Sequence, residues 1–452
     1  MWKFTEKWLL IVRQIRNYLQ GERMWLLAYG CAALLTLAAP DWLALPIGLI
    51  LLMAELTAWL HTIGREVNLG GILRSTILLT MWVAPALAYW GGDATWYSGH
   101  IMPVEAPVYW SLAAPGTAIL NSILRMSWPV PAPGDSKIKP GSAALWLILL
   151  GIAGRLTLPF APPALRLAAH LVSLLCFVGI LYGIMAWPAR RWWWVLGGSL
   201  YAIALALQTT LFGSALLWTI TMVLIAFQFR MISPARLYSL AVLGVFGFFL
   251  LFSFKYDYRK AIQREGRPEP AFQVFTGMLW QRLSHPGEVF NSAVFETFVN
   301  RFNQGYYTAQ TMAWTPDREP FAQGETLWAD LKGALLPRLL APNKHRAGGY
   351  ENMERFAGVS GRSYSMNIGI FGEAYANFGT SGGILCLFGY GLLLAGLMTL
   401  AARHLDPPWW PFIFLPAVHV ESDIGIVLNH LVKAGLVAAA LNGLILLYQK
   451  HR

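Results

Sequence analysis

The sequence predicts an all-α polytopic membrane protein, and its composition and its long apolar runs are the observations that predict it. Of its 452 residues, 56% are hydrophobic and only 13% are charged, which lies outside the range of soluble domains. Backbone groups in lipid must bond internally, so an apolar run of roughly 20 residues is expected to be a spanning helix. Such runs occupy 72–90, 165–187, 192–212, 237–254 and 383–401.

The positively charged residues of the chain are concentrated next to the ends of the apolar runs. The formal net charge is +11, but the cations cluster at the edges of apolar runs, at 188–192, 230–236 and 449–452. This pattern follows the positive-inside rule, and we expect these segments to be cytoplasmic rather than to bind nucleic acid. All three cysteines lie within predicted spans, which disfavours a disulfide framework or a zinc site.

The order of apolar and basic segments predicts about twelve transmembrane helices with both termini in the cytoplasm. Residues 1–23 place apolar side chains on one helical face, which predicts a helix on the cytoplasmic membrane surface; a basic lead-in to the first span is the alternative. With a cytoplasmic N-terminus, placing the basic loops 188–191 and 230–236 in the cytoplasm as well requires an extra crossing within 91–142, which we assign to the weakly apolar stretch Val108–Ile123; the alternative is that one of the other predicted segments is not a true span. The other expected spans are 24–39, 41–62, 72–90, 143–161, 165–187, 192–212, 214–229, 237–254, 383–401, 409–421 and 424–447.

This division gives a transmembrane bundle over 24–254, a large external (periplasmic) loop over 255–382 and C-terminal transmembrane helices over 383–452. A loop of this length is usually either functional or disordered. Aromatic and apolar residues recur in it at helical spacing, as at Phe272, Phe275 and Leu279. The loop is therefore expected to be ordered, with short helices.

Two segments near the end of this loop carry a resemblance to a known family. Pro337-Arg-Leu-Leu-Ala-Pro-Asn-Lys344 is followed by a spacer rich in glycine and serine, and then by Gly372-Glu-Ala-Tyr-Ala-Asn-Phe-Gly379 entering a span. Together with the many spans and the large external loop, this pattern resembles the Wzy-type oligosaccharide repeat-unit polymerases. The fold is also similar to that of O-antigen ligases. Some family members show two long external loops, whereas this chain has one obvious long loop.

The resemblance implies a membrane glycosyltransferase of polysaccharide biosynthesis in the bacterial cytoplasmic (inner) membrane. Its donor would be an undecaprenyl-diphosphate-linked oligosaccharide and its acceptor a second lipid-linked repeat unit, joined at the outer face of the bilayer. The family implies no metal and no other cofactor. A chain-length regulator and a flippase are the further partners that it implies.

This chemistry requires cations for the leaving diphosphate and a base for the acceptor hydroxyl. Anchoring of helices to anionic lipid headgroups is the alternative role for the cations. The predicted diphosphate-binding residues are Arg301, Arg338, Lys344, Arg346 and Arg362.

Carboxylates and histidines near the last spans are the candidates for the base. The predicted catalytic residues are Glu373, Glu421, Asp423 and His430, and Tyr375 and Asn377 are the predicted sugar-binding residues. Glu373 alternatively caps the following span. Asp423, His430 and Lys433 either line a polar cavity or form a buried charge network that locks helix packing. Glu421 and Asp423 could also be read as a metal-binding carboxylate pair, although two carboxylates without further oxygen ligands are a weak metal site.

Two other functions use similar parts. A flippase or transporter of the lipid-linked sugar would be expected to show internal repeats and broken helices at matching positions, and we see none in the sequence. A ligase that transfers a finished glycan to a lipid core uses nearly the same chemistry, and the sequence barely separates it from a polymerase.

Overall fold

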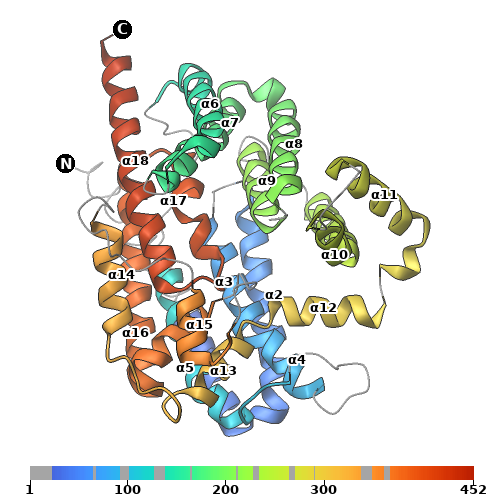
Figure 1. The fold of residues 1–452 in the computed structure, drawn as a ribbon, viewed down its shortest axis with the longest axis vertical. Coiled ribbons are helices and arrows are strands. Elements are labelled where there is room, and N and C mark those ends of the chain that lie inside the picture. Colours follow the sequence, from blue (N-terminus) through green and yellow to red (C-terminus); the bar gives the residue numbers. More distant parts are fainter. Residues whose placement is uncertain are drawn as a thin grey trace, which may run out of the picture.

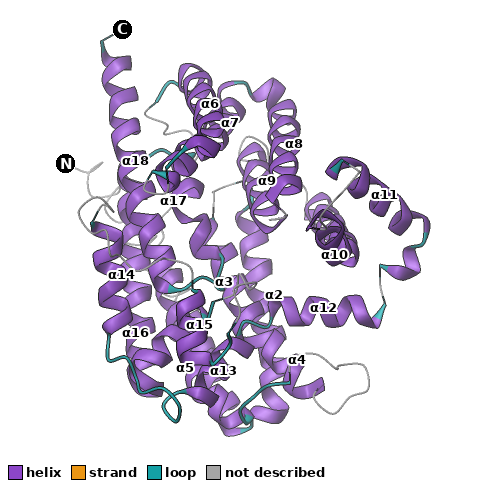
Figure 2. Cartoon of the chain, in the orientation of Figure 1, coloured by secondary structure: helices purple, strands orange, loops and turns teal. Residues whose placement is uncertain are grey.

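The computed structural model describes residues 23–64, 68–91, 101–126, 138–162, 165–209, 212–227, 234–263, 270–289, 291–336, 349–360 and 367–451. Within these ranges every regular element is a helix and no strand occurs (Figure 2). The predicted all-α class is therefore confirmed for this part of the chain. The predicted surface helix over 1–23 lies outside the described residues except for its last position.

In the described part of the chain, six helices are long and apolar enough to cross a membrane. Three shorter apolar helices accompany them, Arg23–Ala38, α9 (Phe212–Phe227) and α17 (Trp409–Val418). These are the helix lengths and compositions of a polytopic membrane protein. The six long helical segments are Pro40–Thr62, Leu69–Gly91, Pro140–Phe160, Arg166–Ala186, Gly369–His404 and Ile424–Lys450.

The weakly apolar stretch Val108–Ile123 is helical and lies within α5 (Ala106–Met126). This helix packs against α16 (Gly369–His404), and more than half of its residues are buried, Thr117 and Asn121 among them. A helix shielded by its neighbours can carry polar side chains that a lipid-facing helix cannot. Its low hydropathy therefore reflects burial in protein.

The N-terminal helices enclose a buried ionic cluster. They are α2 (Pro40–Thr62), α3 (Leu69–Leu78), a π-helical turn (Leu79–Val83) and α4 (Ala84–Gly91). Glu55 of α2 is fully buried and accepts hydrogen bonds from Tyr29 at 2.7 Å, from Arg74 at 3.2 Å and from Arg125 at 2.9 Å. Two cations compensate this carboxylate, as a buried charge requires.

The next helices form two antiparallel hairpins. In the first, α6 (Pro140–Thr157) packs closely on α7 (Arg166–Ala186). Gly151 permits this close approach, since a Cβ atom there would lie 2.2 Å from the backbone nitrogen of Cys176. A short 3₁₀ turn, Leu158–Phe160, ends α6. Another 3₁₀ turn, Pro188–Arg190, leads into the second hairpin, formed by α8 (Arg191–Thr209) and α9.

The described part of residues 255–382 forms mostly short helices. First, α10 (Pro234–Gln263) continues beyond the predicted end of its span at 254. It is followed by α11 (Ala271–Ser284), a 3₁₀ turn (Pro286–Glu288), α12 (Ser292–Phe302), α13 (Gly305–Trp314), α14 (Glu325–Leu335) and α15 (Tyr350–Ala357). In Figure 1, α10 and α11 stand to one side of the bundle, whereas α13, α14 and α15 lie against it.

The C-terminal helices surround the region of interest. α16 begins at Gly369, earlier than the predicted span at 383, because the chain remains helical on both sides of a break at Gly379. The dihedral angles of Gly379 are φ 66° and ψ −162°, a combination that only glycine adopts readily. After α17, the chain reverses into α18 (Ile424–Lys450).

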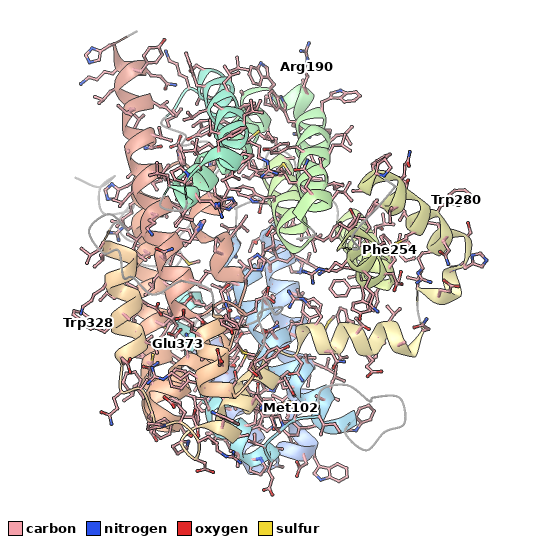
Figure 3. The ribbon with its side chains drawn as sticks, viewed as in Figure 1. Met102, Arg190, Phe254, Trp280, Trp328 and Glu373 are labelled. Atoms are coloured by element: carbon pink, nitrogen blue, oxygen red, sulfur yellow. The ribbon has the colours of Figure 1, made fainter. Side chains whose placement is uncertain are left out.

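A contact between two helix ends shows which segments share one end of the molecule. The Lys139 amide donates to the Gln449 side chain at 2.7 Å, which joins the start of α6 to the end of α18. Arg190 lies toward this end of the molecule, near which the C-terminus also lies, and Met102 lies toward the opposite end (Figure 3). Asn303 donates to the Met102 sulfur, so the start of α13 is at that opposite end as well.

Candidate functional site

The five residues that connect α17 to α18, here called the 419–423 connection, position three ionisable side chains. These are His419, Glu421 and Asp423. The connection lies directly against the first residue of α16, because a Cβ atom at Gly369 would be 2.9 Å from the Val420 carbonyl oxygen. Gly369 has φ +72°, so it supplies both the backbone conformation and the space.

On one side of the connection, Glu421 pairs with Arg301 at the end of α12. The two guanidinium nitrogens lie 2.5 Å and 3.0 Å from the two carboxylate oxygens, a bidentate geometry. The pair is only half-buried, with 39% of the Arg301 side chain and 32% of the Glu421 side chain exposed. Both groups are therefore accessible to a ligand.

Lys255 of α10 adjoins this pair, and Arg259 of the same helix adjoins Lys255. Burial, together with the neighbouring Arg301 and Arg259, lowers the pKa of Lys255 to about 8, and Glu421 opposes the effect only in part. We name Lys255, Arg259, Arg301 and Glu421 the cation centre. Arg301 and Lys255 both interact with the one carboxylate and Arg259 adjoins Lys255, so the excess of positive charge suits an anion with more than one charge.

Both Glu421 and His419 of the connection have a pKa below the ordinary value, for different reasons. Burial by itself would raise the pKa of Glu421, but the paired Arg301 outweighs burial and holds that pKa below its ordinary value. Burial lowers the pKa of His419, although Glu421 opposes this shift. At neutral pH the carboxylate is thus ionised and the imidazole is neutral, so His419 is able to accept a proton.

On the other side of the connection, three carboxyl groups come together: Glu373 of α16, Asp423 at the start of α18, and Asp330 of α14. We name these residues the carboxyl centre. Glu373 is fully buried (Figure 3), and it accepts hydrogen bonds from the Ile424 amide at 2.7 Å and from the Thr326 hydroxyl at 3.1 Å. The Asp330 carboxyl group lies against Gly425, where a Cβ atom would be 2.0 Å from its carboxyl carbon.

Asp423 joins this centre to α15 and α16. Its two oxygens accept from Asn352 at 3.0 Å and from the Gly369 amide at 3.2 Å, and only 2% of the residue is exposed. Burial raises the pKa of Asp423 to about 7, although these two hydrogen bonds oppose the shift. Asp423 therefore changes its charge near neutral pH while it fixes the start of α18.

No protein-family model, curated protein or solved structure matches this chain. Its function is therefore inferred from the side chains of the two centres and from the motif resemblance of residues 337–344 and 372–379.

The predicted sugar-binding residues are both buried on the loop-facing side of α16. The Tyr375 hydroxyl donates to the Thr315 carbonyl at 3.3 Å. The Asn377 amide donates to Thr326 at 2.7 Å and accepts from Gly324 at 3.0 Å. These bonds fix the segment before α14 against α16, and contact of either residue with a sugar stays a prediction.

Asp423, His430 and Lys433, which the sequence grouped in one cavity or network, have different bonding partners in the structure. Asp423 belongs to the carboxyl centre, the His430 ring lies 3.0 Å from the Phe412 carbonyl of α17, and Lys433 bonds to Asn429. Glu421 and Asp423 also face different partners. Within the described ranges, no group of three His, Cys, Asp or Glu side chains is arranged to hold a metal ion.

Four of the predicted diphosphate-binding residues lie outside the described residues. These are Arg338, Lys344, Arg346 and Arg362. Conversely, the structure adds four polar residues that the sequence had not singled out. Lys255 and Arg259 are four residues apart at the end of an apolar run, and this spacing on one helical face could have revealed them. No comparable spacing in the sequence pointed to Asp330 or Asn352.

Proposed function

We propose that this protein joins undecaprenyl-diphosphate-linked oligosaccharide repeat units by metal-independent glycosyl transfer. The observation that carries the proposal is that an accessible cation centre and a neutral histidine are held by one short connection. The motif resemblance supplies the substrate class. The site would lie at the outer face of the bacterial cytoplasmic membrane.

The same proposal includes about twelve spans, cytoplasmic termini and an external segment over 255–382. The contact between Lys139 and Gln449 supports it, because the predicted order of spans places both residues on the cytoplasmic side. Arg190, in a basic loop that is also predicted to be cytoplasmic, lies toward the same end (Figure 3). Arg301 and Met102 belong to segments that are predicted to be external.

In the proposed reaction, the donor diphosphate binds at the cation centre. The bond between the anomeric carbon and the phosphate oxygen breaks, and the electron pair leaves with undecaprenyl diphosphate. Negative charge grows on that phosphate, and the guanidinium groups of Arg301 and Arg259 and the Lys255 ammonium stabilise it. Glu421 keeps Arg301 oriented between turnovers.

The acceptor hydroxyl forms the new bond to the anomeric carbon and loses its proton. His419 is the group that we assign to receive this proton, since it is neutral and lies 3.9 Å from Glu421. Glu373 and Asp423 are buried among protein partners, so we assign them a positioning role for the 419–423 connection.

A repeat-unit ladder tests the proposal. Purified protein in lipid vesicles receives a lipid-diphosphate repeat unit, and the products are separated by size. The unaltered chain should convert single units into a ladder, and Arg301→Ala should slow this conversion on the order of 10²-fold, the effect of removing one transition-state cation or donor. Arg355→Ala is the matched control, because Arg355 pairs with Glu319 and Glu325 away from the cation centre.

Other products would identify the rival functions. Single units that only change leaflet would indicate a flippase, and one transfer to a lipid core without a ladder would indicate a ligase. Equal ladder formation by the unaltered chain and by Arg301→Ala would remove the cation centre from the mechanism.

A further inference from the structure

A groove of about 930 Å³ lies among α6, α7 and α8, away from the cation and carboxyl centres. Its walls are almost entirely apolar and aromatic. They include Ile148, Ile180, Trp187, Trp194 and Tyr201, with Arg190 as a charged lining residue. This combination of a long apolar wall with one cation is typical of sites for amphiphilic ligands.

The cation lies where a membrane lipid would place its headgroup. Arg190 is exposed near the end of the molecule that holds the C-terminus (Figure 3), and it forms no ion pair with any residue that the structure describes. Trp187 and Trp194 stack beside it with ring centroids 5.4 Å apart. Tryptophan beside arginine is the usual composition of the membrane–water interface.

The neighbouring residue adds an unexplained polar atom. Arg191 is buried, and its Nε atom has no hydrogen-bond partner in the described ranges. A buried donor without a partner is destabilising unless some group outside the chain satisfies it. Arg191 follows Arg190 directly in the chain, so positive charge is concentrated next to the lining residue Arg190.

We propose that this groove binds a membrane phospholipid, with one acyl chain against the apolar wall and an anionic headgroup at Arg190. Charge complementarity selects an anionic over a zwitterionic headgroup, because the described part of the chain places no carboxylate in ion-pair contact with Arg190. This binding is independent of the proposed glycosyl transfer.

Two adjacent glycines allow the groove to be filled selectively. A Cβ atom at Gly198 would lie 2.4 Å from the Met222 sulfur, so Gly198 is needed for packing. Gly197 lines the groove, is exposed and has no described atom within 4 Å of a Cβ position. Gly197→Trp therefore fills the groove without a backbone clash. Gly389 of α16 is equally exposed and open, so Gly389→Trp is the matched control.

The test is native mass spectrometry of the full chain in detergent, titrated with phosphatidylglycerol or phosphatidylcholine. The unaltered chain should retain phosphatidylglycerol in preference to phosphatidylcholine. Arg190→Gln should lower that preference about fivefold, the effect of losing one cation near an anionic lipid surface. Gly197→Trp should lose the retained lipid, and Gly389→Trp should keep it.

Four results would overturn the inference. Three are equal retention of the two phospholipids by the unaltered chain, an unchanged preference in Arg190→Gln, and full retention by Gly197→Trp. The fourth is displacement of phosphatidylglycerol by an equal amount of undecaprenyl diphosphate, because the groove would then be a site for the carrier lipid.

Discussion

At the scale of single residues, burial and pairing give two neighbouring acids different charge states. Glu421 stays ionised because Arg301 contacts it with two nitrogens. Burial, with a smaller contribution from Asp330, raises the pKa of Asp423, only two positions later, to about 7. The two acids therefore have separate roles, one with the cations and the other with the start of α18.

The pKa of Asp423 predicts a pH-dependent stability. Its ordinary pKa is near 4, so between pH of about 4 and about 7 the folded chain holds a proton that the unfolded chain has released. The stability that Asp423 contributes is full below pH of about 4 and is lost as the pH rises through about 7. Asp423→Asn should reduce this slope in melting temperatures measured across that range.

The neighbouring acids Glu373 and Asp330 face the same centre, so part of the slope is expected to remain in this variant. Asp317→Asn is the control, since Asp317 is exposed on the connection after α13. An Asp423→Asn slope equal to that of the unaltered chain would contradict the shifted pKa.

The cation centre predicts a response to a free anion. Inorganic pyrophosphate should raise the melting temperature of the detergent-solubilised chain, because binding to the folded state alone stabilises it, by about 2.7 kcal/mol at 100 times Kd. Lys255→Gln combined with Arg259→Gln should abolish most of this rise. Lys332→Gln, which removes an exposed lysine over Trp328, should leave it intact. A rise that survives the double substitution would place the anion elsewhere.

At the scale of elements, α16 depends on one glycine. The conformation of Gly379 is costly for any residue with a side chain, and a Cβ atom there would lie 3.1 Å from the Phe321 ring. Gly379→Ala should therefore lower the free energy of unfolding by about 1–3 kcal/mol. Gly389→Ala in the same helix has open space and should be neutral or stabilising. Thermal unfolding in detergent compares the two, and equal melting temperatures would argue against the break.

The same helices show which elements the sequence could predict. The long apolar runs predicted α7 and α18 well, because both helices are apolar along nearly their whole length. Residues 369–382 precede the expected start of the span at 383, yet they are helical apart from Gly379, since neighbouring helices tolerate their small and polar side chains. Local composition does not reveal such shielding.

At the scale of the whole molecule, the proposed orientation predicts which residues a membrane-impermeant reagent reaches. In a background without Cys31, Cys176 and Cys386, Asp317→Cys should react with an impermeant maleimide from outside the cell. Lys139→Cys should react only after the membrane is opened, because Lys139 adjoins the C-terminal helix end. The reverse pattern would place the cation centre at the cytoplasmic face and would end the proposed function.

The site was only partly predictable, because its contacts join distant parts of the chain. The sequence identified Arg301, Glu373, Glu421 and Asp423, and the structure gathers them around one connection. It did not identify Asp330, which reaches Gly425 only through the packing of α14 on α18. Charged residues in a long loop look alike until tertiary contacts separate them.

The shortness of the 419–423 connection has a consequence for variation in length. Within five positions the backbone must direct the Glu421 side chain toward α12 and the Asp423 side chain toward α15 and α16. It must also place the first amide of α18 where it can donate to Glu373. One inserted or deleted residue would turn these side chains away from both sets of partners at once. Substitutions here can be graded in effect, whereas even a single-residue indel would dismantle both centres together.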